Sequence, residues 1–150
     1  MNTVLKTERS STRQVLFLDV ENKYRSRFAE EYFNSYAIRY GLKVIASSRG
    51  VNKNIESEER TLTEYTTSEL QKRGLYPMQS DRKARCLDNE EAKTYDHIIA
   101  MDADELEPLL QKNYPEIASN VTYWNVKNLV NGNMSSELDK LSRLLDDMLV

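Results

Sequence analysis

The stretch "VLFLDVENKYRSRFAEEYF", residues 15–33, is typical of a hydrophobic strand, a tight polar loop and the start of an amphipathic helix. The first N–H groups of a helix have no partners within the helix, so a strand, loop and helix in this order often bind an anion. The loop nevertheless carries two carboxylates, Asp19 and Glu21, shortly before Arg25 and Ser26. Carboxylates at these positions would repel an anion, so the loop does not fit a simple anion site.

The composition indicates one domain and argues against several classes of protein. The chain has 150 residues, few glycines and prolines, and a formal net charge of −3, which argues against disorder and against a general binder of nucleic acids or anionic membranes. The single cysteine, Cys86, excludes an intramolecular disulfide framework. No apolar run approaches the roughly 20 residues that span a bilayer, and the N-terminus lacks an apolar signal core. We therefore expect a cytoplasmic protein with no membrane partner.

Buried strands alternate with amphipathic helices along the chain. The polar residues 1–13 are predicted to be an N-terminal extension, and residues 14–150 one domain. Four strands separated by helices imply right-handed crossovers. The sequence therefore predicts an α/β fold with a four-stranded parallel sheet that helices cover on both faces. Strands are expected at 14–18, 43–47, 96–101 and 120–124, and helices at 26–40 (ended by Gly41), 61–74, after a cap at Asp102, and 135–150.

Several motifs, in order and at matching spacing, resemble the low-molecular-weight protein tyrosine phosphatase family, which includes thioredoxin-coupled arsenate reductases. The opening stretch resembles that family's strand, CxGNxxRS phosphate loop and following helix. The matches are Asn22, Arg25, Ser26, Ala29 and Glu30 in that stretch, then "SSRG" (47–50), "LQKRGL" (70–75), "DHIIAMDADEL" (96–106) and "NYPE" (113–116). The resemblance implies the low-molecular-weight phosphatase fold, in which the four parallel strands lie in the order 2-1-3-4 and helices flank the sheet in a flavodoxin-like three-layer arrangement.

The resemblance also implies that the chain is a degenerate member of that family. The nucleophilic cysteine corresponds to Asp19, the loop glycine to Glu21, the following proline to Arg27 and the general acid to Asn128. A carboxamide cannot donate the required proton, and Cys86 lies in a distant segment. We therefore expect a non-catalytic binding or regulatory pseudophosphatase without a cofactor, which acts with a protein partner or as a homodimer. Its anion loop comprises Asp19, Val20, Glu21, Asn22, Lys23, Tyr24, Arg25 and Ser26.

Three interpretations of the loop carboxylates remain open at this stage. In the first, Asp19 pairs with Arg25 and replaces the missing anion, while Glu21 is solvated. In the second, carboxylates at the sheet edge bind Mg²⁺ or Mn²⁺, as in an NYN/PIN-like nuclease or another carboxylate–metal phosphohydrolase. In the third, Asp19 is itself a nucleophile, as in haloacid-dehalogenase-like phosphatases. The metal ligands in the second case would be Asp19, Glu21, Asp102 and Asp104, although Asp102 also suits a simple helix cap.

Overall fold

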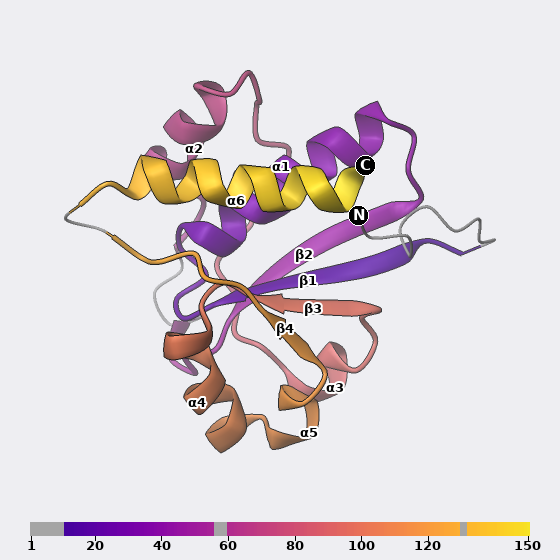
Figure 1. The fold of residues 1–150 in the computed structure, drawn as a ribbon, viewed down its shortest axis with the longest axis vertical. Coiled ribbons are helices and arrows are strands. Elements are labelled where there is room, and N and C mark those ends of the chain that lie inside the picture. The colour runs from indigo at the N-terminus through magenta and orange to yellow at the C-terminus, as the bar shows by residue number, and fades with distance from the viewer. Residues whose placement is uncertain (1–10, 56–59, 130–131) are drawn as a thin grey trace.

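A parallel sheet runs through the centre of the protein (Figure 1). The computed structural model describes residues 11–55, 60–129 and 132–150, so most of the expected N-terminal extension lies outside the described residues. The strand order is β2-β1-β3-β4, which confirms the predicted α/β class and topology. The strands are β1 (Arg13–Asp19), β2 (Val44–Gly50), β3 (His97–Ala100) and β4 (Val121–Tyr123).

Helices cover both faces of the sheet and complete the three layers (Figure 1). One face carries α1 (Arg25–Arg39), α2 (Glu64–Gln71) and α6 (Met134–Leu149), and the other carries α3 (Asn89–Ala92), α4 (Ala103–Asn113) and α5 (Pro115–Ala118). The short helices α3 and α5 are additions to the expected set. Within the described ranges, no helix is long and apolar enough to cross a membrane.

The central strand β1 supplies the middle of the hydrophobic core. Its residues from Val15 to Leu18 are fully buried, because neighbouring strands pair with both of its edges and helices cover both faces. Phe17 packs against Phe33 of α1 and against Trp124, with ring centroids 5.8 and 6.2 Å apart. This burial holds the carboxyl end of β1, and therefore Asp19, in a fixed position.

Helix α1 ends where the sequence predicts. Gly41 has a φ of +67°, a left-handed conformation that glycine adopts without steric cost. Its N–H donates to the carbonyl of Ile38, and the N–H of Leu42 donates to that of Ala37. This is the Schellman arrangement that commonly ends helices. Tyr40, at the C-terminal end of this helix, is exposed.

Strand β2 is longer than predicted and reaches Gly50 instead of ending at Ser47. Residues 48–50 look like a polar loop in the sequence, but they pair in register with residues 17–19 of β1. Their polar side chains have partners inside the protein, since Ser48 donates to Glu30 at 2.6 Å and Arg49 pairs with Glu91 at 2.8 Å. The outer edge of β2 is closed by Asn34, whose amide accepts from the N–H of Ala46 and donates to its carbonyl.

A buried carboxylate joins α2 to α6. Glu69 is 1% exposed and accepts hydrogen bonds from Lys72, Arg73 and the Ser135 hydroxyl at 2.7, 3.0 and 2.9 Å. Arg73 also pairs with Asp139 of α6. Burial opposes the ionisation of Glu69, but these hydrogen bonds outweigh it and lower its pKa below the usual 4.5. The carboxylate is thus held charged and fixes α2 against α6.

Candidate functional site

The side chain of Asp19 accepts hydrogen bonds from the loop that follows it. One carboxylate oxygen accepts from the N–H of Asn22 at 2.6 Å, and the other accepts from the N–H of Ser26 at 2.9 Å. The residue before α1, Tyr24, gives this helix no side-chain cap. Asp19 therefore supplies the negative charge that a helix N-terminus favours. Two backbone donors of the loop, the N–H groups of Asn22 and Ser26, are therefore engaged by the chain's own carboxylate.

Asn22 holds the loop in its tight form. Its φ of +51° lies in the left-handed region, which asparagine tolerates better than most residues. Its amide nitrogen donates to the hydroxyls of Ser26 and Ser48, both at 2.9 Å, and its amide oxygen accepts from the N–H of Arg85. The loop is consequently bound to α1, to β2 and to the segment that precedes α3.

Arg25 has a partner that the sequence analysis missed. Its guanidinium donates to Glu105 at 2.8 Å and to the carbonyl of Val126 at 3.0 Å. The expected pairing of Asp19 with Arg25 is wrong, because Asp19 binds loop N–H groups and Arg25 binds the first turn of α4. The sequence did contain a signal for Glu105, since it follows strand β3 by a few residues and the ends of parallel strands meet at one sheet edge.

A small hollow remains at the loop. Its volume is about 40 Å³, which is room for a few water molecules at most. Glu21 is half-buried rather than fully solvated, and it accepts a hydrogen bond from the Asn52 side chain at 2.8 Å. The residues that line this loop hollow are Asp19, Val20, Glu21, Lys23, Tyr24, Arg25 and Asn128. Asn128 thus lies at the loop, whereas Asn22 and Ser26 are not among the residues that line the hollow.

The carboxylates proposed as metal ligands are engaged elsewhere. Asp102 caps α4 by accepting from the N–H of Asp104, which confirms the simpler interpretation of this residue. Lys127 donates to Asp102 at 2.8 Å and to Asp104 at 3.0 Å, and these hydrogen bonds raise the pKa of its ammonium group. In the described part of the chain, no group of three or more His, Cys, Asp or Glu side chains is arranged to hold a metal ion.

Behind the loop lies a buried network of charged side chains that the sequence pattern did not reveal. Arg27 is 1% exposed and donates to the carbonyls of Gln79 and Arg82, both at 3.0 Å. Burial, followed by repulsion from Arg82, lowers the pKa of Arg27 to about 10. Glu30 pairs with Arg82, and Glu31 accepts from the N–H groups of residues 78 and 79. This network attaches an irregular segment to the helix that begins at the loop.

Gly50 allows the end of β2 to lie directly against the loop. A Cβ atom at this position would be 2.7 Å from the carbonyl oxygen of Val20 and 2.8 Å from the nitrogen of Asn22, and would also overlap Ile55. Gly50 forms a bridge with Cys86 on its other side. The Cys86 thiol contacts the Tyr114 hydroxyl at 3.6 Å and is not among the side chains that line the loop hollow.

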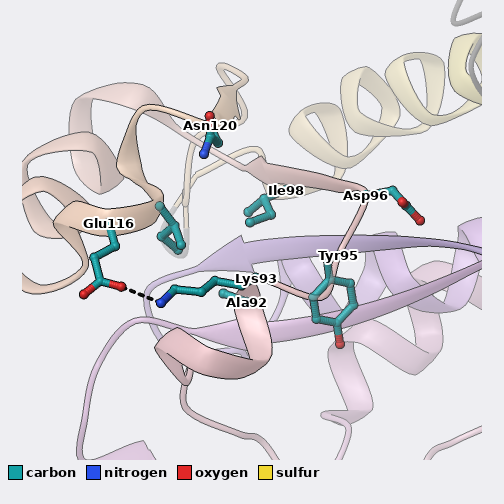
Figure 2. A pocket seen from close by; sticks show the side chains of 8 residues that line it. Ala92, Lys93, Tyr95, Asp96, Ile98, Glu116 and Asn120 are labelled. Carbon is teal, nitrogen blue, oxygen red and sulfur yellow. Dashed lines mark ion pairs between the residues drawn. The ribbon is translucent and has the colours of Figure 1, made fainter.

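A larger cavity lies at the opposite edge of the sheet (Figure 2). Its volume is about 480 Å³, and its lining comes from residues around α3 and α5, from Ile98 in β3 and from the residues before β3 and β4. Lys93 and Glu116 form an ion pair of 2.7 Å beside it. None of its lining residues belongs to the loop hollow.

Comparison with known proteins decides the family. The model of the low molecular weight phosphotyrosine protein phosphatase family matches residues 14–138. The chain belongs to this phosphatase family. A comparison with curated protein sequences gave no match.

Solved phosphatase structures share the fold. YfkJ from Bacillus subtilis is 24% identical with a TM-score of 0.76, covering 95% of this chain and 94% of its own. The phosphatase from T. tengcongensis is 24% identical with a TM-score of 0.73, covering 92% and 95%. The arginine phosphatase YwlE, in a form with a phosphorylated active-site serine, is 21% identical with a TM-score of 0.74, covering 91% and 93%. At these identities the similarity establishes the fold alone.

Proposed function

We propose that this chain is a pseudophosphatase, a member of the low-molecular-weight phosphatase family that binds or regulates without catalysing phosphate transfer. One observation carries the proposal. The Asp19 carboxylate, at the place that corresponds to the family's nucleophile, accepts hydrogen bonds from the loop N–H groups of Asn22 and Ser26. The chain's own anion therefore uses donors that a phosphate would need.

The charges at the loop also oppose phosphate binding. A unit charge about 4 Å away contributes roughly 4 kcal/mol at an effective dielectric constant of about 20. The attraction of a phosphate to Arg25 is offset by Glu105, which lies 2.8 Å from the guanidinium. Asp19 and Glu21 both line the loop hollow and add further repulsion.

The groups required for the chemistry are also absent from the corresponding positions. Covalent phosphate transfer requires a nucleophile that is free to attack and an acid that can protonate the leaving group. Both carboxylate oxygens of Asp19 accept hydrogen bonds from the backbone. Asn128, which lines the loop hollow at the place of the acid, has a carboxamide that cannot donate an acidic proton.

The role that remains is recognition of another molecule. The scaffold of the site is rigid, because hydrogen bonds attach the loop to α1, β2 and the segment before α3. We propose that the protein acts in the cytoplasm, where a single cysteine stays reduced. Its partner would be another protein or a second copy of the chain.

Hydrolysis of p-nitrophenyl phosphate tests the proposal. We expect the wild-type protein to show no turnover above the buffer background, while an active family member assayed alongside hydrolyses the substrate. Arg25→Ala and Arg39→Ala are matched variants, since both remove an arginine from α1 but only the first lies at the loop. Turnover by the wild type that is lost in Arg25→Ala and kept in Arg39→Ala would overturn the proposal.

A further inference from the structure

The cavity beside α3 and α5 is large enough to hold a small molecule (Figure 2). Its volume of about 480 Å³ lies within the range of about 300–1,000 Å³ that is typical of ligand sites. Its buried lining consists of three aliphatic side chains, none more than 6% exposed: Ala92, Ile98 and Ile117. Its polar lining consists of Lys93, Tyr95, Asp96, Glu116 and Asn120. The cavity therefore combines an apolar floor with a polar rim.

The charges on this rim attract cations rather than anions. Among the described lining residues there are two carboxylates, Asp96 and Glu116, and one ammonium group, that of Lys93. The Lys93 ammonium is already bound by Glu116 at 2.7 Å and by Glu90 at 3.1 Å. The hydrogen bond between Lys93 and Glu116 raises the pKa of the ammonium and lowers the pKa of the carboxyl, so both are charged at neutral pH. An anion would have to compete with two carboxylates for Lys93, whereas a cation meets an excess of negative charge.

The two carboxylates of the rim lie on different sides of the apolar floor. Glu116 belongs to α5, Asp96 precedes β3, and Figure 2 shows them on opposite sides of Ile98. The N–H of Gln14 in β1 donates to one oxygen of Asp96 at 2.8 Å and so holds this carboxylate at the start of the sheet. Glu116 binds Lys93 through Oε2, and a carboxylate can accept from several donors. A ligand with two positive charges could therefore reach both carboxylates.

We propose that this cavity binds a linear diamine, with one ammonium group at Glu116, the other at Asp96, and the methylene chain on the apolar floor between them. The Tyr95 ring adds an aromatic surface that attracts cations, and the carboxamide oxygen of Asn120 can accept from an ammonium N–H. The protein itself shows that Glu116 binds an alkylammonium, since Lys93 occupies one of its oxygens. The inference does not rest on the proposed function, because no lining residue of this cavity belongs to the loop hollow.

A metal ion and a monoamine fit the cavity less well. Mg²⁺ and Ca²⁺ need about six oxygen ligands or more around one point. The described residues contain no group of three or more His, Cys, Asp or Glu side chains arranged in that way. A monoamine would use only one of the two carboxylates, whereas a diamine uses both and covers the aliphatic floor as well.

Chemical-shift mapping with small amines tests the inference. The probes are putrescine, which is a diamine on a butane chain, n-butylamine, which has one charge on the same chain, butanediol, which has none, and magnesium chloride. All are titrated at neutral pH and constant ionic strength. We expect putrescine to cause saturable shifts of the amides around the cavity, in residues 92–98 and 116–120. n-Butylamine should bind about fivefold more weakly, because it forms one exposed ion pair fewer, and butanediol and magnesium should cause no saturable shift there.

Matched variants identify the residues that recognise the diamine. Glu116→Gln should weaken putrescine binding about fivefold, whereas Glu107→Gln, the same change at an exposed position of α4 outside the cavity, should leave it unchanged. Asp96→Asn should weaken binding by a similar factor, and it keeps an oxygen that can accept from the N–H of Gln14. Lys93→Gln should strengthen binding, because it removes a cation that competes for Glu116.

Four results would overturn the inference. These are no saturable shift with putrescine, equal affinity for n-butylamine, unchanged affinity in Glu116→Gln, and loss of binding in Lys93→Gln, which would indicate an anion site instead. Hydrolysis of p-nitrophenyl phosphate tests the proposed function separately. A protein that shows neither turnover nor putrescine binding would remain a pseudophosphatase but would lack this second ligand.

Discussion

Replacing Asp19 by alanine should both weaken the fold and create an anion site. Asp19 is 2% exposed and accepts two backbone hydrogen bonds, at 2.6 and 2.9 Å. A hydrogen bond to a charged group contributes about 1.5–3 kcal/mol. Since water can enter the vacated space, we expect a net loss of about 3 kcal/mol. For a chain of this size, that corresponds to a fall of roughly 6–12 °C in the melting temperature.

Phosphate should restore part of the lost stability, because the N–H groups of Asn22 and Ser26 become available in Asp19→Ala. For a dissociation constant of about 1 mM, 10 mM phosphate stabilises the folded state by about 1.4 kcal/mol, or roughly 3–6 °C. Thermal unfolding is measured in increasing phosphate at constant ionic strength, with chloride as the control anion. Adding Glu105→Gln should enlarge the effect, since it releases Arg25.

The wild type provides the decisive comparison. Its loop donors are engaged by Asp19, so its melting temperature should not change with phosphate in this range. Equal phosphate shifts in the wild type and in Asp19→Ala would show that the carboxylate does not occupy the anion site. If Asp19→Ala is as stable as the wild type, the two hydrogen bonds that Asp19 accepts make no net contribution to the stability of the fold.

Three further perturbations test the structure around the site. Because the pKa of Glu69 is lowered in the folded state, its ionised carboxylate adds to the free energy of unfolding above about pH 4.5, and this stabilisation is lost as the pH falls through the folded-state pKa. Between pH 6 and 3 the free energy of unfolding, measured by urea denaturation, should therefore fall less in Glu69→Gln than in the wild type. Gly50→Ala should force the loop away from Val20 and Asn22, seen as large amide shifts and a loss of about 1–3 kcal/mol. Arg27→Met removes one member of a buried charge network and should cost about 3 kcal/mol in urea denaturation, whereas Arg39→Met, at the exposed end of α1, should cost less than about 0.5 kcal/mol.

The features that depend on neighbouring residues in the chain could be predicted from the sequence. The apolar run of β1, the end of α1 at Gly41 and the cap at Asp102 all follow from local patterns, and the alternation of strands and helices implies the sheet. The order of the strands also follows from the family resemblance. These signals place Asp19 at the carboxyl edge of a central strand without any structure.

The features that depend on contacts distant in sequence could not be predicted. Arg25 lies 80 residues from Glu105, so its ion-pair partner could not be selected from the many carboxylates of the chain. The same is true of Ser48, which looks like a loop residue until Glu30 and Asn22 are seen to bind its hydroxyl. Polar residues that are satisfied by distant partners resemble solvent-exposed residues in the sequence alone.

The amide of Asn34 has a consequence for how copies of this protein can associate. An exposed edge strand usually offers free N–H and C=O groups to the strand of another molecule, which leads to open-ended aggregation. At the middle of β2, both groups of Ala46 are already bound by one side chain of α1. An incoming strand would have to remove that side chain before it could pair. Contacts between molecules are thereby directed away from this sheet edge and toward side-chain surfaces, where sequence determines the choice of partner.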